Sequence, residues 1–163
     1  PIPITLDALR GRVVVIEAFQ MLCPGCVAHG IPQALEIAST FRPADVAVLG
    51  LHTVFEHHAA MTPTSLEAFL HEYRVGFPVA VDQPADGDPT PVTMSTYGLR
   101  GTPSLIVIDQ HGIIRAHNFG RTPDLQVGAL IGALIAEHQA STHLEPTSTP
   151  AAVGCDADGC AAS

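Results

Sequence analysis

A run of β-branched and apolar residues, V-V-V-I-E-A-F at 13–19, is followed closely by C-P-G-C at 23–26. The run is apolar on both faces, which is typical of a central strand in a sheet covered by helices. Pro24 is tolerated in the first turn of a helix, so a helix is expected to begin at the cysteines. The segment therefore predicts a strand that leads into a helix, with one acidic residue, Glu17, inside the strand.

Hydrophobic periodicity extends this pattern along the chain. A strand is expected where a β-branched run lies between turn residues, and a helix where apolar residues recur every three or four positions. Strands are predicted at residues 13–19, 46–51, 79–81, 105–108 and 113–117, and helices at 24–41, 62–73, 92–97 and 125–139. Crossover connections then give parallel strands first, and a hairpin closes the sheet. This order predicts an α/β fold with a mixed central sheet flanked by helices.

Three local features refine the predicted helices. Pro32 lies inside the first helix and is expected to kink it. Thr64 and Glu67 have the spacing of a capping box at the start of the second helix. The last helix contains G-A-L-I-G-A-L-I-A at 128–136, and we expect its glycines to let it approach the sheet closely.

The charge excludes one class of partner. The chain has 163 residues, a formal net charge of −9 and only seven Lys plus Arg, whereas nucleic-acid binding needs clustered positive charge. No apolar run in the sequence approaches the roughly 18 residues that span a bilayer. We therefore expect a soluble domain, in the cytoplasm or the periplasm, that binds no nucleic acid and does not span a membrane.

The spacing of Cys23 and Cys26 indicates redox chemistry. A thiol at a helix N-terminus meets unpaired N–H groups and the positive end of the helix dipole, and both favour its thiolate form. Cys26 lies one turn later, within reach for a disulfide, so it can act as the resolving thiol after Cys23 has attacked. A zinc half-site or two unrelated buried cysteines are the alternatives.

Two motifs resemble the thioredoxin superfamily: F-Q-M-L-C-P-G-C at the end of the first strand, and G-T-P-S-L-I-V-I-D from residue 101. The lead-in L-D-A-L-R-G-R-V-V-V-I-E-A-F is similar to that of its redoxin and TlpA-like branch. The resemblance implies a thioredoxin-like three-layer sandwich over residues 1–140. It also implies a thiol–disulfide oxidoreductase.

The resemblance also implies roles for residues outside the cysteine pair. Glu17 lies six positions before Cys23, where thioredoxins bury an acidic residue. Burial raises the pKa of a carboxyl group, so Glu17 is expected to take the proton of Cys26. The alternative is a side chain that escapes to a polar strand end.

Gly101-Thr102-Pro103 resembles the family loop in which a cis proline faces the cysteines. With Pro24 and Gly25, residues Thr102 and Pro103 are then expected to bind the substrate, Thr102 through its backbone. An ordinary trans proline is the alternative. Expected partners are protein thiols and disulfides or small thiols, together with a reductase partner, and no cofactor is expected.

Two residues depart from the family pattern. The residue before Cys23 is Leu22 rather than Trp, and the chain has no Trp at all. The helix proline, Pro32, comes one residue later after Cys26 than the family pattern suggests. The contact surface and the local helix geometry are therefore expected to differ.

Two other functions compete with disulfide exchange. A peroxiredoxin-like peroxidase needs a Thr three residues before its reactive Cys, and this chain has Gln20 there. A copper or zinc carrier could combine the cysteines with histidines in a soft N/S site. The candidate histidine ligands are His29, His52, His57 and His58. Copper carriers of this fold typically space their cysteines by three residues, and this chain spaces them by two.

A second cysteine pair lies in a Ser-, Thr-, Pro- and Ala-rich tail, predicted over residues 141–163. Cys155 and Cys160 flank D-A-D-G. They can close a small disulfide ring, exchange with Cys23 and Cys26 as an internal relay, or bind a metal together with Asp156 and Asp158. The sequence leaves these three interpretations open.

Overall fold

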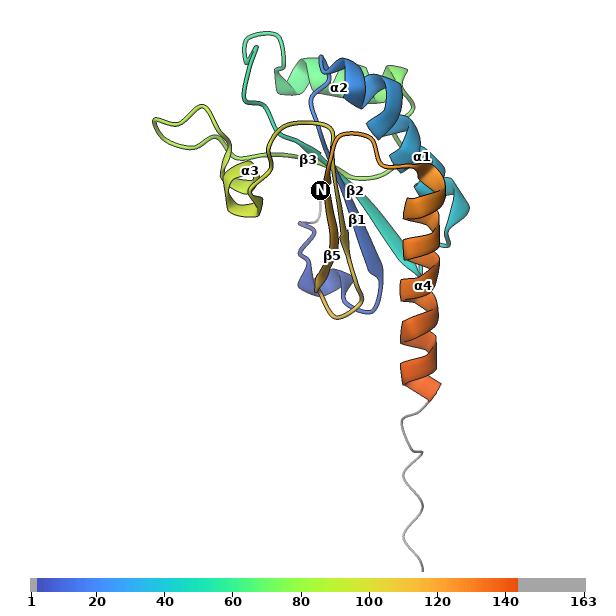
Figure 1. Cartoon of the computed structure of the whole chain (residues 1–163). Helices are drawn as coiled ribbons and strands as arrows, with labels where there is room; N and C mark the ends of the chain where they lie inside the picture. The colour runs from blue at the N-terminus through green and yellow to red at the C-terminus, as the bar shows by residue number, and fades with distance from the viewer. Residues whose placement is uncertain (1–2, 144–163) are drawn as a thin grey trace, which may run out of the picture.

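Five strands form one mixed sheet in the order β3-β2-β1-β4-β5 in the computed structural model, which describes residues 3–143 (Figure 1). The strands are β1 (Val13–Phe19), β2 (Val46–His52), β3 (Val79–Val81), β4 (Ser104–Ile108) and β5 (Ile114–Phe119). The first three run parallel, whereas β4 is antiparallel to both β1 and β5. The predicted parallel strands and closing hairpin are therefore confirmed.

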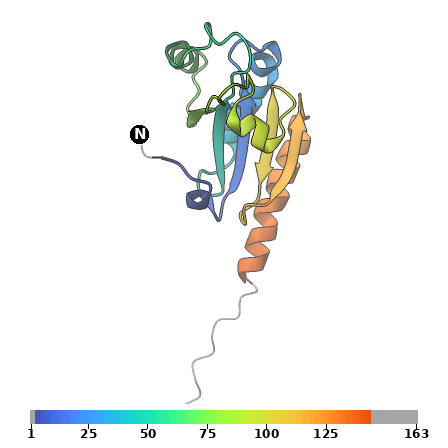
Figure 2. The same cartoon turned by 90° about the vertical axis from the view of Figure 1, so that its left-hand side faces the viewer.

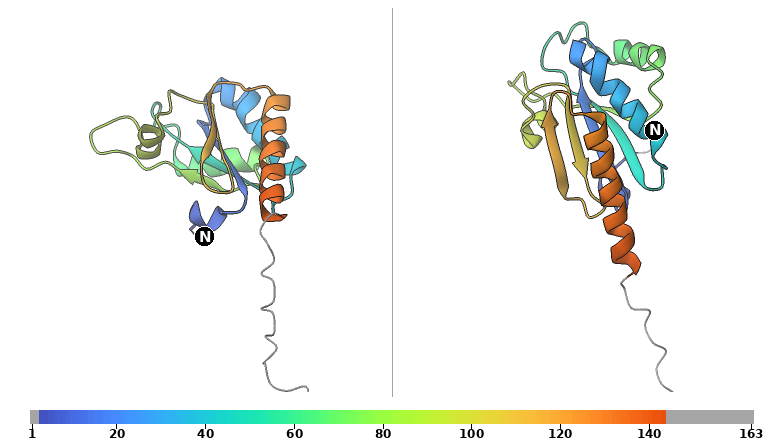
Figure 3. Two further views of the ribbon diagram at one scale, coloured as in Figure 1. Left: turned by 60° about the horizontal axis from the view of Figure 1, so that its bottom comes forward. Right: turned by 45° about the vertical axis from the view of Figure 1, so that its right-hand side comes forward.

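Helices cover both faces of this sheet. One face carries α1 (Ile31–Thr40) and α4 (Asp124–His143), which lie side by side over the strands in Figure 3. The other carries η1 (Asp7–Leu9) and α3 (Val92–Tyr97), so that α3 lies in front of the sheet and α4 behind it in Figure 2. A further helix, α2 (Pro63–Glu72), packs beside the start of α1. The three-layer α/β sandwich is confirmed.

The alternation of β1 side chains explains how one strand serves both layers. Val13 and Val15 belong to the core beneath α1 and α4, while Val14 and Ala18 belong to the core beneath η1 and α3. Successive side chains of a strand point to opposite faces, so an apolar residue is needed at nearly every position. Glu17 follows Val15 on the α1 side of the sheet.

The helix that follows the cysteines is not uniform. It begins at Pro24 and reaches Thr40, but the segment η2 (Cys26–Gly30) is π-helical. A π turn contains one residue more than an α turn, and Pro32 follows it in the first turn of α1. The irregularity expected near Pro32 is therefore a π turn, which absorbs the additional residue between Cys26 and Pro32.

The predicted cap of α2 is wrong. Its N-cap is Thr62, whose side-chain oxygen accepts a hydrogen bond from the backbone N–H of Ser65 at 3.2 Å. Pro63 occupies the first helical turn, where its missing N–H costs no intrahelical hydrogen bond. This position of the proline moves the helix start ahead of Thr64, which was the predicted cap.

The prediction for the glycines of α4 is also wrong. The helix packs on the sheet through Val127, Ile131 and Leu134. A Cβ atom on Gly128 or Gly132 would have no neighbour within 4 Å, so neither glycine permits a close approach. The helix also continues to His143, so the predicted boundary between domain and tail at 140/141 falls in its last turn. Cys155 and Cys160 lie outside the described residues.

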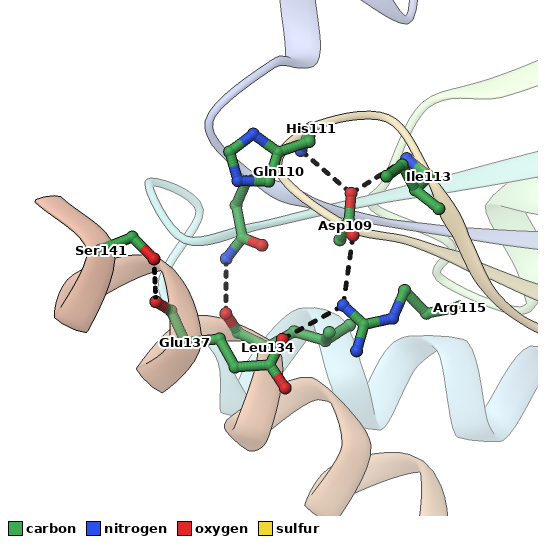
Figure 4. Close-up of polar contacts among 8 residues, drawn as sticks. All are labelled: Asp109, Gln110, His111, Ile113, Arg115, Leu134, Glu137 and Ser141. Carbon is green, nitrogen blue, oxygen red and sulfur yellow. Dashed lines mark hydrogen bonds and ion pairs between the residues drawn. The ribbon is translucent and has the colours of Figure 1, made fainter.

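Asp109, in the turn between β4 and β5, ties the hairpin to α4 (Figure 4). Its carboxylate accepts hydrogen bonds from the backbone N–H groups of His111 at 3.0 Å and Ile113 at 2.9 Å, and from Arg115 at 3.2 Å. Arg115 also pairs with Glu137 of α4 at 3.1 Å. Burial opposes ionisation of Asp109, but these hydrogen bonds lower its pKa. The β4–β5 hairpin, which begins directly after Pro103, is thus held against α4.

No helix within residues 3–143 is both long enough and apolar enough to span a bilayer.

Candidate active site

Cys23 and Cys26 lie where β1 passes into the helix. The N–H of Cys23 donates to the carbonyl oxygen of Gln20 at 3.1 Å, which forms the turn after the strand. The N–H of Cys26 in turn points at the Cys23 sulfur, with 3.4 Å between nitrogen and Sγ. Both are free thiols; Cys23 is partly exposed, and Cys26 is fully buried. The structure therefore places the two sulfurs on one turn of helix, with only the first accessible.

The environment of Cys23 favours its thiolate. Burial opposes ionisation of this sulfur, but hydrogen bonds from the thiol and the backbone N–H of Cys26 outweigh it, so that the pKa of Cys23 is lowered. In its thiol form, Cys23 donates to the carbonyl oxygen of Thr102 at 3.4 Å. Donors aimed at a sulfur at a helix N-terminus are a known means of acidifying a nucleophilic cysteine.

The environment of Cys26 has the opposite effect. Burial raises its pKa, and its hydrogen bond to Cys23 raises it further, to about 12. A thiol with this pKa keeps its proton at neutral pH. The two sulfurs thus divide their roles by environment: the accessible one ionises, and the buried one needs a base before it can attack.

Glu17 lies at the centre of the sheet, opposite Gly50 of β2 and Leu105 of β4. Its side chain is 1% exposed, and among the described residues its Oε1 has no hydrogen-bond partner. Burial raises the pKa of this carboxyl well above its usual value, and the negative charge of Cys23 raises it further. Glu17 is therefore a buried acid whose pKa depends on burial and on the charge of the attacking sulfur.

The loop before β4 faces the cysteines. The Thr102–Pro103 peptide bond is cis, as the resemblance implied. A Cβ atom on Gly25 would lie 3.1 Å from Cδ of Pro103 and 3.9 Å from Sγ of Cys23. The Pro103 carbonyl oxygen accepts a hydrogen bond from the N–H of Gly120 at 2.8 Å, which fixes the loop to the end of β5. Pro24, which directly precedes Gly25, is exposed.

Gly30 was not predicted as a site residue. A Cβ atom here would overlap Oε1 of Glu17 and come within 3.0 Å of Cβ of Pro103. Gly30 therefore allows the π turn to pass directly over the buried acid. A glycine inside a helical pattern usually has a packing reason, and this signal could have identified it.

An aromatic residue beside the cis-proline loop was not predicted either. Phe119, at the end of β5, is 50% exposed, and a Cβ atom on Gly101 would lie 2.8 Å from its ring. The guanidinium carbon of Arg100 is 5.4 Å from the ring centre, within the range of a cation–π contact. Leu22, in the place of the family Trp, is 55% exposed. Only the fold brings Phe119 to this loop, since nothing in the hairpin sequence marks it.

The side chain of Gln20 is hydrogen-bonded to the loop after β2 rather than to the sulfurs. Its Oε1 accepts a hydrogen bond from the N–H of Phe55 at 3.3 Å, and its Nε2 donates to Glu56 at 3.4 Å. Gln20 is 1% exposed and holds the loop after β2. It is therefore occupied in a structural contact.

Among the described residues, the candidate histidines join no group of three or more potential metal ligands. His52 is buried beside the ring of Phe19, and burial lowers its pKa to about 4. His29, His57 and His58 are exposed. Within residues 3–143, no three His, Cys, Asp or Glu side chains gather as a metal site would need.

Comparisons with known proteins agree with this geometry. The model of the AhpC/TSA family matches residues 2–117. A crystal structure of a thioredoxin-like superfamily protein is 61% identical, with a TM-score of 0.80 over 82% of this chain and 86% of that one. A thiol–disulfide isomerase from Corynebacterium glutamicum is 49% identical, with a TM-score of 0.81 over 83% of this chain and 88% of that one.

A curated relative is much longer than this chain. Protein DipZ of Mycobacterium bovis is 26% identical over 148 residues, which are 90% of this chain but only 20% of DipZ. The match therefore concerns one part of that protein.

Proposed function

Because the chain belongs to the AhpC/TSA family, we propose that it is a thiol–disulfide oxidoreductase that uses Cys23 and Cys26. The observation that carries this proposal is the placement of the two sulfurs on one turn of helix: Cys23 is partly exposed and accepts the N–H of Cys26 at 3.4 Å, whereas Cys26 is buried. These environments lower the pKa of Cys23 and raise that of Cys26. The Corynebacterium glutamicum structure, named as a thiol–disulfide isomerase and nearly half identical, supports the same reaction class. The partners we propose are protein thiols and disulfides or small thiols, with a reductase partner that resets the pair.

In the first step, the Cys23 thiolate attacks one sulfur of a partner disulfide. A bond forms between Cys23 and that sulfur, the partner S–S bond breaks, and the other partner sulfur leaves as a thiolate that takes a proton from solvent. The product is a mixed disulfide. Its formation removes the negative charge from Cys23.

In the second step, Cys26 resolves the mixed disulfide. Its thiol gives a proton to the Glu17 carboxylate, and the resulting thiolate attacks Cys23 Sγ. The partner sulfur leaves as a thiolate, so the partner has gained two electrons and the pair has become a disulfide. The same steps in reverse oxidise a partner dithiol. A base is needed because the pKa of Cys26 is about 12.

The cis-proline loop is the proposed substrate platform. The Thr102 carbonyl already lies 3.4 Å from Cys23 Sγ, so an extended partner segment that pairs with this backbone would bring its disulfide to the attacking sulfur. Gly25 keeps Pro103 close to the cysteines, and Pro24 borders the same surface. Leu22 and Phe119 offer exposed apolar side chains to a protein partner.

Peroxide reduction is less well supported, because the side chain at the position of the peroxidase Thr, Gln20, is bonded to the loop at Phe55 and Glu56. Metal carriage is less well supported because, within the described part of the chain, no three His, Cys, Asp or Glu side chains form a group that could hold a metal ion.

The reduction of insulin disulfides by dithiothreitol tests the proposal. The wild-type protein should accelerate it, and Cys23→Ser should abolish the acceleration. Ala129→Ser, a small exposed change on α4, is the matched control and should act as the wild type does. Full turnover by Cys23→Ser would refute the proposed mechanism.

A further inference from the structure

A groove of about 690 Å³ runs along the edge of the sheet beside the first half of β2. The short strand β3 pairs only with residues 50–52 of β2, so residues 46–49, which line the groove, lie at this edge. The other walls come from the N-terminal segment with η1, from the second half of α1 and from the connection between α2 and β3. In Figure 2 the N-terminal segment lies beside the start of β2.

The lining of this groove is largely apolar. Core side chains reach it from three elements, namely Leu35, Val46, Val48 and Phe77. Ile4 of the N-terminal segment also lines it and is 50% exposed. The volume lies within the roughly 300–1,000 Å³ of small-ligand pockets, which are mostly apolar. The four strand residues alone extend roughly 10 Å, so the groove suits a long apolar group rather than a compact one.

The arginines of the chain are unequally paired, and the unpaired ones lie in this groove. All seven basic residues are arginines. Four of them lie close to a carboxylate, namely Arg10, Arg42, Arg115 and Arg121. Arg100 lies over the ring of Phe119. The remaining two, Arg12 and Arg74, have no carboxylate partner within residues 3–143, and both line the groove.

Arg12 is the more enclosed of these two cations. It is half-buried, and its Nη1 donates to the carbonyl oxygen of Pro43 at 3.3 Å. A guanidinium has five N–H donors, so others remain for a ligand. Taking a cation out of water is unfavourable unless an anion compensates for the lost hydration. Arg12 therefore favours an anionic group in the groove.

Arg74 adds a second positive charge on a fixed turn. The N–H groups of Arg74 and Val75 donate to the carbonyl oxygens of His71 at 3.1 Å and Leu70 at 2.9 Å, which holds the backbone at the end of α2. Its side chain is exposed. No Asp or Glu is among the described residues that line the groove, although the protein has a net charge of −9. The groove is thus a local positive site in an acidic protein.

We propose that this groove binds a fatty acid, whose acyl chain lies along β2 and whose carboxylate pairs with Arg12. Arg74 attracts the same carboxylate through its charge. The cysteines follow the end of β1, which runs parallel to β2, so the groove lies toward the opposite end of the sheet. Binding involves no redox step and is independent of the proposed thiol chemistry.

Other occupants satisfy only part of this groove. A small anion would leave the apolar lining in water, and an uncharged apolar molecule would leave the arginines unpaired. An extended peptide would find few backbone partners, because only alternate residues of a strand face one edge. Gly50 donates to Pro78 on this edge at 2.9 Å, so Val48 and Val46 face it too. The N–H of Val46 is already bonded to Arg42 at 3.0 Å, which leaves Val48 as the one residue of 46–49 that offers both groups there.

Calorimetric titration of the full chain with dodecanoate, below its critical micelle concentration, tests the proposal. We expect one dodecanoate per chain. Decanoate and octanoate should bind more weakly, by roughly threefold to fourfold for each CH2 group removed, as for buried methylene groups. Dodecanol and dodecyltrimethylammonium carry the same chain without the negative charge. Each should bind at least roughly tenfold more weakly than dodecanoate, because neither can form a charge-assisted hydrogen bond as a carboxylate does.

Variants separate the carboxylate contact from the acyl chain contact. Arg12→Gln should weaken dodecanoate binding roughly tenfold and leave dodecanol binding unchanged. Arg74→Gln, at an exposed position, should weaken it only roughly twofold to threefold. Arg121→Gln, an exposed arginine outside the groove, is the matched control and should bind as the wild type does. Ala38→Phe places a large side chain on the exposed groove side of α1 and should abolish binding, whereas Ala129→Phe on α4 should not.

Three results would overturn the fatty-acid site. The first is failure of the full wild-type chain to bind dodecanoate. The second is equal binding of dodecanoate and dodecanol, or equal binding of dodecanoate by Arg12→Gln and the wild type, since either would remove the carboxylate contact. The third is an equal effect of Ala38→Phe and Ala129→Phe, which would place the acyl chain elsewhere. Urea unfolding of each variant verifies that it is folded, and Arg74→Gln replaces Arg12→Gln if the latter is not.

Discussion

The Oε1 atom of Glu17 lies so close to the backbone of Gly30 that a Cβ atom at position 30 would overlap it. Only glycine fits at this position beside the buried acid. The same Cβ atom would press on Pro103. One glycine of the π turn therefore sets how closely the helix, the buried acid and the cis-proline loop approach one another.

Gly30→Ala should destabilise the protein, because the new methyl group must displace Glu17, Pro103 or the helix. We expect a loss of roughly 1–3 kcal/mol in the free energy of unfolding, as for overpacked cores. Gly128→Ala is the matched control: it lies in α4 with no neighbour within 4 Å of the new atom, and it should stabilise by roughly 0.4–1 kcal/mol. Urea unfolding of both variants gives the comparison. Equal effects of the two changes would contradict the contact at Gly30.

Cys26→Ser should trap partners on the protein. Without a resolving thiol, the mixed disulfide between Cys23 and the partner persists until an external thiol cleaves it. Non-reducing electrophoresis and intact mass after mixing with an oxidised protein substrate would detect the adduct, and dithiothreitol should release it. The double variant Cys23→Ser/Cys26→Ser should form no such adduct at this site. Trapping through another residue would show that Cys23 is not the attacking group.

Cys23 should react with iodoacetamide at lower pH than an ordinary thiol does. Its pKa is lowered from 9.0, so the alkylation rate should reach half of its maximum below pH 9.0. Cys26→Ala removes the thiol donor and should shift this midpoint upward, whereas Cys26→Ser keeps a hydroxyl donor and should shift it less. Stopped-flow alkylation across pH measures all three. A wild-type midpoint at or above pH 9.0 would contradict the hydrogen bonds proposed to acidify this sulfur.

His52 should make the fold sensitive to acid. Its pKa falls from 6.5 to about 4 on folding, because burial disfavours the charged ring. Between these values the unfolded chain binds the proton and the folded chain does not. The contribution of His52 to the free energy of unfolding is therefore fully present above pH 6.5 and decreases as the pH falls toward 4.

The loss of unfolding free energy between pH 6.5 and 4 should be smaller in His52→Phe, whose ring binds no proton. Glu17 acts with the opposite sign, because its raised pKa favours the folded state at low pH, so only comparison with the variant isolates His52. Urea unfolding at a series of pH values provides the slopes, with the exposed His58→Phe as control. Parallel curves for His52→Phe and the wild type would show that His52 charges freely in the folded state.

The tail cysteines should not set the potential of the active pair. We expect Cys155→Ser/Cys160→Ser to leave the redox midpoint of Cys23 and Cys26 unchanged, because two cysteines so close in sequence can close a ring with each other. Redox titration of the wild type and the double variant tests this. A shifted midpoint would instead identify a relay between the pairs, and zinc bound by the wild type but lost by the variant would identify a metal site.

The sequence alone predicted those parts of the protein that depend on local signals. The β-branched run of β1, the start of a helix at Pro24 and the order of the strands follow from residue types and periodicity, which act over a few neighbouring residues. The burial of Glu17 and the cis bond at Pro103 were implied by resemblance, and both are present in the structure. At α2 the local signal was ambiguous: Thr62 and Thr64 both fit a cap, and Pro63 decided between them.

Tertiary packing determined the remaining features of the site, because contacts between residues far apart in the chain depend on strand register and helix rotation. It placed Gly30 against Glu17 and Pro103, set Phe119 over Gly101, and turned the side chain of Gln20 toward Glu56. It also opened a pocket from the π turn to the buried carboxyl. A glycine inside a helical pattern hints at close packing but does not name its neighbours. The partners in each of these contacts come from separate elements, so only the folded chain identifies them.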